Sequence, residues 1–200
     1  MFFKKTKVPV EVSARHCHLS KADLEKLFGQ GYELKVKKQL YQPLDFAAEE
    51  TITIKEGDKE IKDVRIVGPL RNQTQVEISK TDAIALEINP PVRLSGALKN
   101  SAGITLEGPK GSVELNEGLI VARRHLHCAT KEAKQAGLRA GQLISVQIAG
   151  ERALTFHCVE VRVREDYKLC LHLDTDEGNA AGINKTGEGT LVVTKFKADK

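Results

Sequence analysis

EVSARHCHLSKADLEKLFGQGYEL (Glu11–Leu34) and IVARRHLHCATKEAKQAGLRAGQLISV (Ile120–Val146) are two stretches of the chain that share one pattern. In each, alternating apolar residues lead to Arg-His-x-His, and a Ser or Thr, a short helical segment, glycines and a new apolar run follow. We align Ser20 with Thr130, which places one inserted residue after the second histidine of the later copy. The pattern indicates an internal duplication whose unit is a strand, a short helix and further strands.

Both copies carry the signals of a brief helix. Ser20 is expected to cap the first helix, Asp23 to complete a capping box with it, and Gly29 to end the helix. In the second copy we expect Thr130 to cap the helix and Gly137 to end it. These helices are short because the apolar positions between cap and glycine are few.

The residues before the first helix alternate as in a single strand. Val10, Val12 and Ala14 precede His16 and His18, and all five fall on one face because side chains alternate with a period of two. Most of the remaining chain also has strand character, over residues 51–55, 63–68, 73–79, 103–106, 112–115, 143–148, 153–164, 168–173 and 190–195. Many short strands with few helices favour barrels or a sandwich.

Composition excludes several classes of protein. The 200 residues, 40% hydrophobic and 29% charged, are typical of a globular protein, and the net charge of +4 is spread along the chain. We therefore expect no nucleic-acid partner, since such proteins gather basic residues beside stacking aromatics. No segment approaches the roughly 20 apolar residues that span a bilayer, and no signal peptide precedes the first copy. We expect a cytoplasmic protein whose four cysteines are thiols.

The two His-x-His pairs are candidate metal ligands. Two histidines on one face of a strand can converge on one ion, and neutral imidazole is a favoured zinc ligand. A single pair is more often a structural or surface feature, but chance does not place the same pair at equivalent positions of a repeat. A catalytic zinc usually has three protein ligands, so each pair needs a third. The residue types leave the choice open among His157, His172, Glu77 and the four cysteines. Cys17, between His16 and His18, points to the opposite face and is interpreted as a small buried residue.

The segment GPLRNQTQVEIS (Gly68–Ser79) is unusually polar for a strand. Gln73, Gln75, Glu77 and Ser79 share a face, which is either exposed to solvent or the wall of a polar pocket. Arg71 offers a planar guanidinium that suits phosphate. Other familiar motifs are absent: Asp174–Gly182 departs from a calcium-binding loop, and neither a Walker A loop nor Gly-x-Ser-x-Gly occurs.

Together, RHCHLS, GPLRNQTQVEIS, ARRHLH and LHLDTDEGNAAG resemble the PduL-type phosphate acyltransferases, which include the phosphate propanoyltransferases of bacterial microcompartments. The resemblance runs in order from about Val8 to Val193. It implies a mainly β fold of two barrels from an internal duplication, with short capping helices. It also implies two zinc ions at the seam of the barrels and exchange of an acyl group between coenzyme A and inorganic phosphate.

The resemblance also assigns individual residues. Arg71 matches the arginine that positions phosphate. The positions that match zinc ligands fall into two sets, His16, His18 and Glu77 for one ion and His125, His127 and His172 for the other. The positions that match the coenzyme A path are Ser13, Lys38, Arg65 and Asn179.

The resemblance further implies an interlaced domain organisation. Residues 5–14 and 123–200 would form one barrel, 15–28 and 50–122 the other, and 29–49 a small two-stranded excursion that covers the site. A homodimer or higher homo-oligomer is expected. The chain differs from the family pattern at Cys17, Cys128 and the lid residues Leu44 and Asp45, and it lacks the N-terminal extension that targets some relatives to a microcompartment.

The expected activity is therefore zinc-dependent acyl transfer in which phosphate attacks the thioester directly, without an acyl-enzyme. Two alternatives stay open. Paired zinc ions also serve hydrolases of thioesters or phosphate esters. A β-barrel binding module with structural zinc would have closed four-ligand sites and no turnover.

Overall fold

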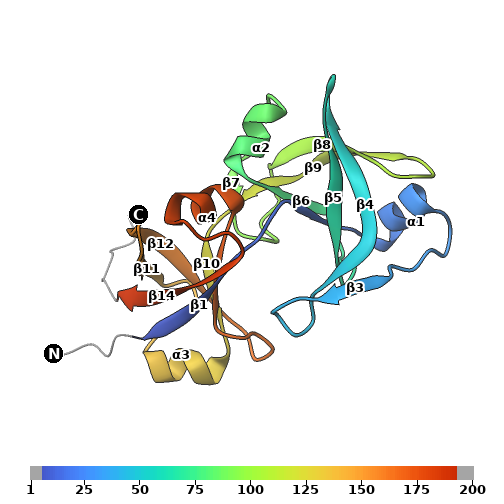
Figure 1. Cartoon of the computed structure of the whole chain (residues 1–200). Coiled ribbons are helices and arrows are strands. Elements are labelled where there is room, and N and C mark those ends of the chain that lie inside the picture. Colours follow the sequence, from blue (N-terminus) through green and yellow to red (C-terminus); the bar gives the residue numbers. More distant parts are fainter. Residues whose placement is uncertain (1–5, 193–200) are drawn as a thin grey trace. The chain divides into compact units, whose positions relative to one another are not determined.

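The computed structural model describes residues 6–192, and the chain divides into two compact units (Figure 1). Unit 1 combines Met1–Ser13 with Arg123–Lys200, and unit 2 comprises Ala14–Ala122. Unit 1 is thus built from both ends of the chain. Residue 5 and residues 193–200 of the predicted first barrel, and with them the end of the predicted strand 190–195, lie outside the described residues.

The described part of unit 1 is a closed barrel with the strand order β1-β13-β10-β12-β11-β14. The pairs β1–β13 and β10–β12 are parallel, and the other four pairs are antiparallel. Two short helices, α3 (Thr130–Ala136) and α4 (Thr175–Ala181), belong to this unit. The strands are β1 (Lys7–Val12), β10 (His125–Cys128), β11 (Leu143–Ile148), β12 (Leu154–Val163), β13 (Cys170–Leu173) and β14 (Thr186–Val192).

Unit 2 repeats this architecture. Its strands β4, β5, β2, β6 and β9 pair in that order, and β8 closes the ring by pairing with both β9 and β4. Strand β3 extends the sheet beside β4, and β7 extends it beside β9. The helices are α1 (Lys21–Phe28) and α2 (Lys80–Ala85). The strands are β2 (His16–His18), β3 (Val36–Gln39), β4 (Phe46–Glu56), β5 (Lys59–Gly68), β6 (Gln75–Ile78), β7 (Val92–Arg93), β8 (Ala102–Glu107) and β9 (Ser112–Ala122). The prediction of a mainly β fold with two barrels and short helices is confirmed.

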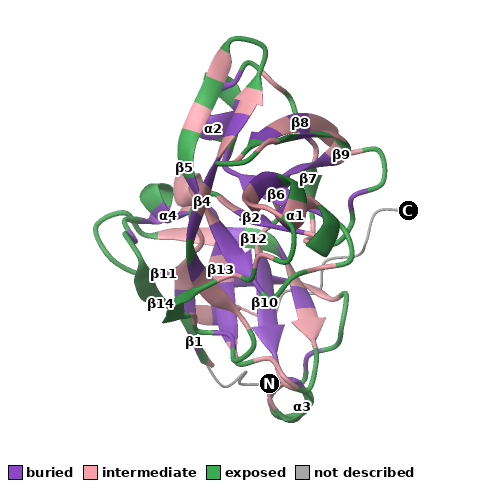
Figure 2. Cartoon of the chain, turned by 90° about the vertical axis from the view of Figure 1, so that its right-hand side faces the viewer, coloured by how far each residue is buried: buried purple, intermediate pink, exposed green. Residues whose placement is uncertain are grey.

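Each barrel has its own apolar core. In unit 1, Val8, Val10, Leu126 and Leu171 belong to one buried cluster, and in unit 2 Cys17, Ile66 and Val76 belong to another. Figure 2 shows buried residues along the strands and mostly exposed ones on α3. Among the helices of residues 6–192, none is long and apolar enough to cross a membrane.

The prediction of one continuous strand from Val10 to His18 is wrong. Strand β1 ends at Val12 and pairs with β13 and β14, whereas β2 starts at His16 and pairs with β5 and β6. The chain leaves one sheet and enters another between them, and the division between the units falls after Ser13. The alternation of residues on the two faces continues from β1 into β2 although the strand is interrupted, because β1 and β2 each have one apolar face. The sequence pattern therefore does not reveal the break.

The helix predictions are confirmed for the Ser20 cap and for the two terminal glycines, but not for the capping box or for the cap of the second helix. Ser20 caps α1 by accepting the amide of Asp23, and Gly29 and Gly137 follow the ends of α1 and α3. The expected capping box is incomplete, because the Ser20 amide donates to Thr74 Oγ1 at 2.9 Å and not to Asp23. The cap of α3 is Ala129, so the prediction of Thr130 is wrong. Glu132 takes over the capping by accepting the Ala129 amide at 2.7 Å.

Candidate metal centres

The first candidate centre lies on the neighbouring strands β2 and β6 of unit 2. The antiparallel register places His16 opposite Glu77 and His18 opposite Gln75. Residues opposite each other share a face of the sheet, and Cys17 and Val76 between them point into the apolar core. His16, His18 and Glu77 each present a donor atom, and these atoms lie within 4.8 Å of one another. His16 Nε2 is 3.8 Å from Glu77 Oε1. The three predicted ligands are therefore side by side.

Both histidines of this centre are oriented by backbone carbonyls. His16 Nδ1 lies 2.9 Å from the Ala14 carbonyl oxygen, and His18 Nδ1 lies 2.9 Å from that of Val67. Each Nδ1 must carry the proton to donate to a carbonyl, which leaves Nε2 with a lone pair directed away from the backbone. Burial, followed by electrostatic interaction with His16 and with the Arg71 guanidinium, lowers the pKa of His18 well below its ordinary value. His18 is thus held neutral, the form that binds metal ions.

A polar network fixes the carboxylate of this centre. Gln75 and Glu77 are almost fully buried, and the Gln75 amide donates to both Glu77 Oε1 and Ser95 Oγ. Gln75 Oε1 accepts the Gly96 amide at 2.7 Å. The interpretation of this face as exposed to solvent is therefore wrong for Gln75 and Glu77. Buried polar groups require such partners, and these fix the position of the Glu77 carboxylate.

Arg71 is anchored beside the same centre. Its amide donates to the Leu19 carbonyl at 2.9 Å, and its guanidinium Nη1 donates to Ser95 Oγ at 2.8 Å. Ser95 thus connects Arg71 with Gln75, which in turn holds Glu77. The arginine is half-buried, and its charge contributes to the low pKa of His18. An anchored guanidinium next to candidate metal ligands can attract and orient an anion.

The second candidate centre occupies the equivalent strands β10 and β13 of unit 1. Here the antiparallel register places His125 opposite His172 and His127 opposite Cys170. The ring centroids of His125, His127 and His172 are 4.5 to 5.2 Å apart. His125 Nδ1 lies 2.8 Å from the Arg123 carbonyl oxygen, the counterpart of the contact between His16 and Ala14. The three predicted histidines are therefore brought together, although their donor atoms do not converge as closely as those of the first centre.

His127 is the least satisfied polar residue of this centre. It is buried, and neither of its ring nitrogens has a hydrogen-bond partner among residues 6–192. Its ring stacks on Tyr167 with a centroid distance of 3.9 Å. Burial, and after it the charges of His125, His172 and two arginines, strongly lower the pKa of His127. A neutral, buried imidazole with two unpaired nitrogens is costly unless a ligand completes it, and a metal ion is such a ligand.

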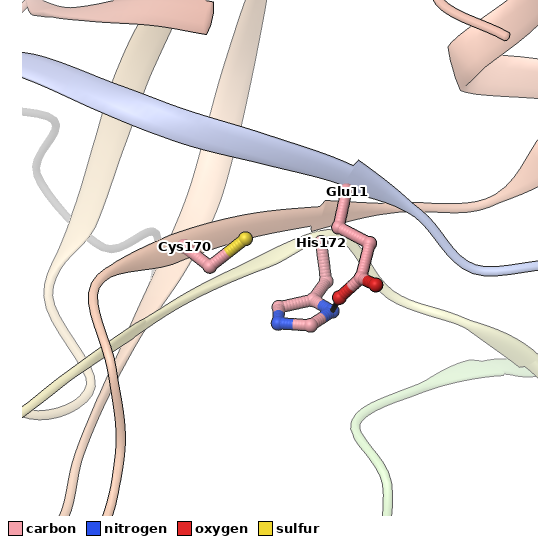
Figure 3. Close-up of side chains that lie close together, drawn as sticks. All are labelled: Glu11, Cys170 and His172. Carbon is pink, nitrogen blue, oxygen red and sulfur yellow. Dashed lines mark ion pairs between the residues drawn. The ribbon is translucent and has the colours of Figure 1, made fainter. Parts of the chain in front are cut away.

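His172 is also the centre of a second set of donors (Figure 3). Glu11 on β1 is aligned with His172 in the parallel register, and its Oε2 lies 3.8 Å from His172 Nδ1. The donor atoms of Glu11, Cys170 and His172 all lie within 4.8 Å of one another. A carboxylate next to the ring nitrogen of a histidine orients that ring for metal binding. Cys170 was one of the four cysteines left open as a third ligand in the sequence analysis, whereas Glu11 was not among the candidates.

The two centres share one local construction. In each of the four ligand-bearing strands, a ligand position lies two residues before the N-cap of a short helix. The pairs of ligand and N-cap are His18 and Ser20, Glu77 and Ser79, His127 and Ala129, and His172 and Asp174. The duplication is therefore in register without an insertion, and the alignment of Ser20 with Thr130 was wrong by one residue. Helices α2 and α4, which the sequence patterns did not reveal, complete the repeat.

The arginine of Arg-His-x-His has a structural partner in both units. Arg15 Nη2 lies 2.7 Å from Asp82 Oδ1, and Arg124 Nη1 lies 2.7 Å from Glu177 Oε1. Asp82 and Glu177 are the third residues of α2 and α4, where they also take part in capping. Arg15 thus connects the start of β2 with α2, the helix that follows β6. Arg124 connects the start of β10 with α4, the helix that follows β13. This explains why arginine belongs to the repeated motif.

Of the four residues predicted to line the coenzyme A path, two are exposed and two donate hydrogen bonds to backbone carbonyls. Lys38 on β3 and Asn179 on α4 are exposed, and the Ser13 amide donates to the Leu173 carbonyl. The Arg65 guanidinium donates to the carbonyls of Ala48 and Glu49 at 3.1 and 2.7 Å. Arg65 therefore also fastens the end of the predicted excursion 29–49. The contacts of these four residues with coenzyme A stay a prediction, as does a covering role of 29–49.

Comparisons with known proteins identify relatives of the whole fold. The family model described as phosphate propanoyltransferase matches residues 9–184. A phosphate propanoyltransferase of Thermotoga maritima is 47% identical over 95% of this chain and 90% of its own. Proteins of the same name from Priestia megaterium and Salmonella typhimurium are 52% and 46% identical, over 90% and 88% of this chain and 83% and 84% of their own lengths.

Proposed function

Because the chain belongs to the phosphate propanoyltransferase family and is an acyltransferase, we propose that it reversibly transfers a short acyl group between coenzyme A and inorganic phosphate. The observation that carries the proposal is the anchored guanidinium of Arg71 beside His16, His18 and Glu77. The relatives are named for the propanoyl group. Propanoyl and acetyl differ by one methylene, worth about 1–3 kcal/mol in an apolar pocket, so the enzyme is expected to accept both with a preference.

Arg71 is the proposed phosphate-binding residue. Its Nη1 is held by Ser95, which fixes the plane of the guanidinium, and a planar fork of donors matches the geometry of a phosphate. A phosphate oriented there would be presented to the thioester carbonyl in one defined geometry. Orientation and charge stabilisation of this kind supply a large part of catalysis in transfer reactions.

The donor sets fit two zinc ions. His16, His18 and Glu77 would hold one, and His125, His127 and His172 the other. Burial lowers the pKa of His18 and of His127, which holds both imidazoles neutral, and His127 has two buried nitrogens without a hydrogen-bond partner among residues 6–192. Neutral imidazoles are the form that binds metal ions. Bound zinc would supply Lewis acidity toward a carbonyl oxygen and affinity for a thiolate leaving group. The carbonyls of Ala14, Val67 and Arg123 keep three of the rings oriented.

Direct attack by phosphate is proposed, since the cysteines on the ligand-bearing strands β2, β10 and β13 are unsuited to hold an acyl group. Cys17, Cys128 and Cys170 are buried, and burial raises the pKa of Cys128 to about 11 and that of Cys170 to about 12. These thiols are protonated near neutral pH and are poor nucleophiles. Ser145 Oγ lies 2.8 Å from His157 Nδ1, but Ser145 is fully buried. A substrate therefore has no access to this serine.

The proposal is tested by the release of free coenzyme A from propanoyl-CoA with and without phosphate. We expect turnover to depend on phosphate, and Arg71→Ala to lower kcat/KM for phosphate roughly 10- to 100-fold, the value of a charge-assisted contact of about 1.5–3 kcal/mol. The zinc content should stay unchanged. Arg93→Ala is the matched control, because Arg93 is an exposed arginine of the same unit and donates only to the Val92 carbonyl in the described contacts.

Three other outcomes would contradict the proposal. Turnover with water alone would favour a hydrolase, in which paired metal ions are also common. Zinc binding without any turnover would favour a binding module. A burst of coenzyme A release without phosphate, together with acylated protein, would exclude direct attack.

A further inference from the structure

The two candidate centres differ at one corner. Each is a square of four residues on two antiparallel strands. In unit 2 the residue opposite the second histidine, His18, is Gln75, and in unit 1 the residue opposite His127 is Cys170. Gln75 is a poor metal ligand, and its amide is occupied by Glu77, Ser95 and the Gly96 amide. Cys170 is a thiol at the position where a fourth ligand would stand.

Cys170 shares the face of the sheet that carries the histidines. It shares its face of β13 with His172, because side chains two residues apart point the same way. Its neighbours Leu171 and Leu173 belong to the apolar cluster of unit 1, whereas Cys170 is buried without belonging to that cluster. Cys17 and Cys128, in contrast, both belong to the apolar core of their unit. Figure 3 shows Cys170 and His172 on the same strand, with Glu11 on the adjacent one.

The residue opposite Cys170, His127, lacks hydrogen-bond partners among residues 6–192. His127 is 7% exposed, and both of its ring nitrogens are without a hydrogen bond in the described part of the chain. The same position in unit 2, His18, is anchored through Nδ1 by a carbonyl. The Cys170 thiol lies within 4.8 Å of a donor atom of His172, and the register sets Cys170 opposite His127. Three imidazoles with one thiol on the same face are a mixed nitrogen and sulfur donor set of the kind that zinc prefers.

We propose that Cys170 is a fourth protein ligand of the metal ion in unit 1, together with His125, His127 and His172. The metal replaces the thiol proton, which is released to solvent, so the site has one sulfur and three nitrogen donors. The centre of unit 1 then has four protein ligands, one more than the centre of unit 2, where Gln75 occupies the equivalent position. The inference rests on the metal binding of the proposed function, not on acyl transfer.

Cobalt(II) loading of the metal-free full chain tests this assignment directly. A thiolate bound to cobalt gives an intense sulfur-to-metal charge-transfer band in the near ultraviolet, which nitrogen and oxygen ligands do not give. We expect the band in the wild type, with an intensity that corresponds to one thiolate per chain. Cys170→Ser should abolish it, and Cys158→Ser should leave it unchanged, since Cys158 is an exposed cysteine of the same unit.

Metal affinity gives a second readout that does not depend on turnover. In a titration with a chromophoric chelator, Cys170→Ser should release one zinc ion roughly 10- to 100-fold more readily, while the other keeps its wild-type affinity. Cys170→Ala, checked by circular dichroism, should behave in the same way and guards against a folding defect of one variant. Absence of the band in the cobalt-loaded wild type, or its persistence in Cys170→Ser, would overturn the assignment. Loss of acyl transfer in a wild type that shows the band would contradict the proposed function alone.

Discussion

Replacing Arg15 by Gln tests the structural role that unit 2 gives to the arginine of the repeated motif. The Arg15 side chain is 45% exposed, whereas that of its partner Asp82 is 7% exposed. The guanidinium contacts Asp82 Oδ1 twice, through Nη2 at 2.7 Å and through Nε at 3.0 Å. Without Arg15, the buried carboxylate keeps the neutral Ser79 amide as a hydrogen-bond donor at 3.2 Å but loses its cationic partner.

The size of the effect follows from this burial. Breaking a fully buried ion pair costs about 3–5 kcal/mol, and an exposed pair contributes at most about 1 kcal/mol. With one buried and one half-exposed partner, we expect Arg15→Gln to lower the free energy of unfolding of unit 2 by about 2 kcal/mol. Asp82→Asn keeps an oxygen for the Ser79 amide, so the double variant should lose about 1 kcal/mol less than the sum of the single variants.

Hydrogen exchange followed by mass spectrometry is the appropriate assay, because peptides from β2 and β6 report on unit 2 separately from unit 1. Lys62→Gln is the matched control: Lys62 pairs with Glu60 at 2.9 Å, but the two side chains are 68% and 37% exposed. We expect the control to change stability by less than about 0.5 kcal/mol. The reasoning would be refuted if Arg15→Gln changed it equally little, or cost the same in the Asp82→Asn background.

Three further predictions concern the caps, the packing and the thiols. Glu132→Ala should lower the stability of unit 1 by about 1 kcal/mol, because Glu132 caps Ala129, whereas Thr130→Ala should cost less than about 0.5 kcal/mol in the same denaturation experiment. Equal losses would contradict the observed cap. Gly108→Ala should destabilise unit 2 by about 1–3 kcal/mol, measured by hydrogen exchange, since a Cβ there would lie 2.6 Å from the Leu27 carbonyl oxygen. If Gly108→Ala were as stable as the wild type, the close approach of residue 108 to Leu27 would carry no cost and the prediction would be wrong. Iodoacetamide should label Cys158 rapidly in the folded metal-free chain, and mass spectrometry should find Cys17, Cys128 and Cys170 protected from about pH 7 to about pH 9, because burial raises the pKa of all three. Rapid labelling of a second cysteine would show that a buried thiol is accessible.

The sequence determined the features that depend on local pattern. The duplication, the two His-x-His pairs, the burial of Cys17 and the ends of α1 and α3 at glycine all follow from spacing and residue type. The pairing of each motif with a third ligand did not follow from spacing. Glu77 and His172 lie far along the chain from the histidines they join, and only the resemblance to a family singled them out.

Tertiary structure decided what depends on register between distant strands. The pairs His16–Glu77 and His125–His172 exist because β2 pairs with β6, and β10 with β13, in one alignment out of several possible ones. The same alignment made Gln75 a support for Glu77, set Cys170 opposite His127, and joined Arg15 to Asp82. The sequence alone shows which side chains share a face of a strand, because alternation is local. Which residue of another strand lies opposite each of them is decided only when the strands pair and the barrels close.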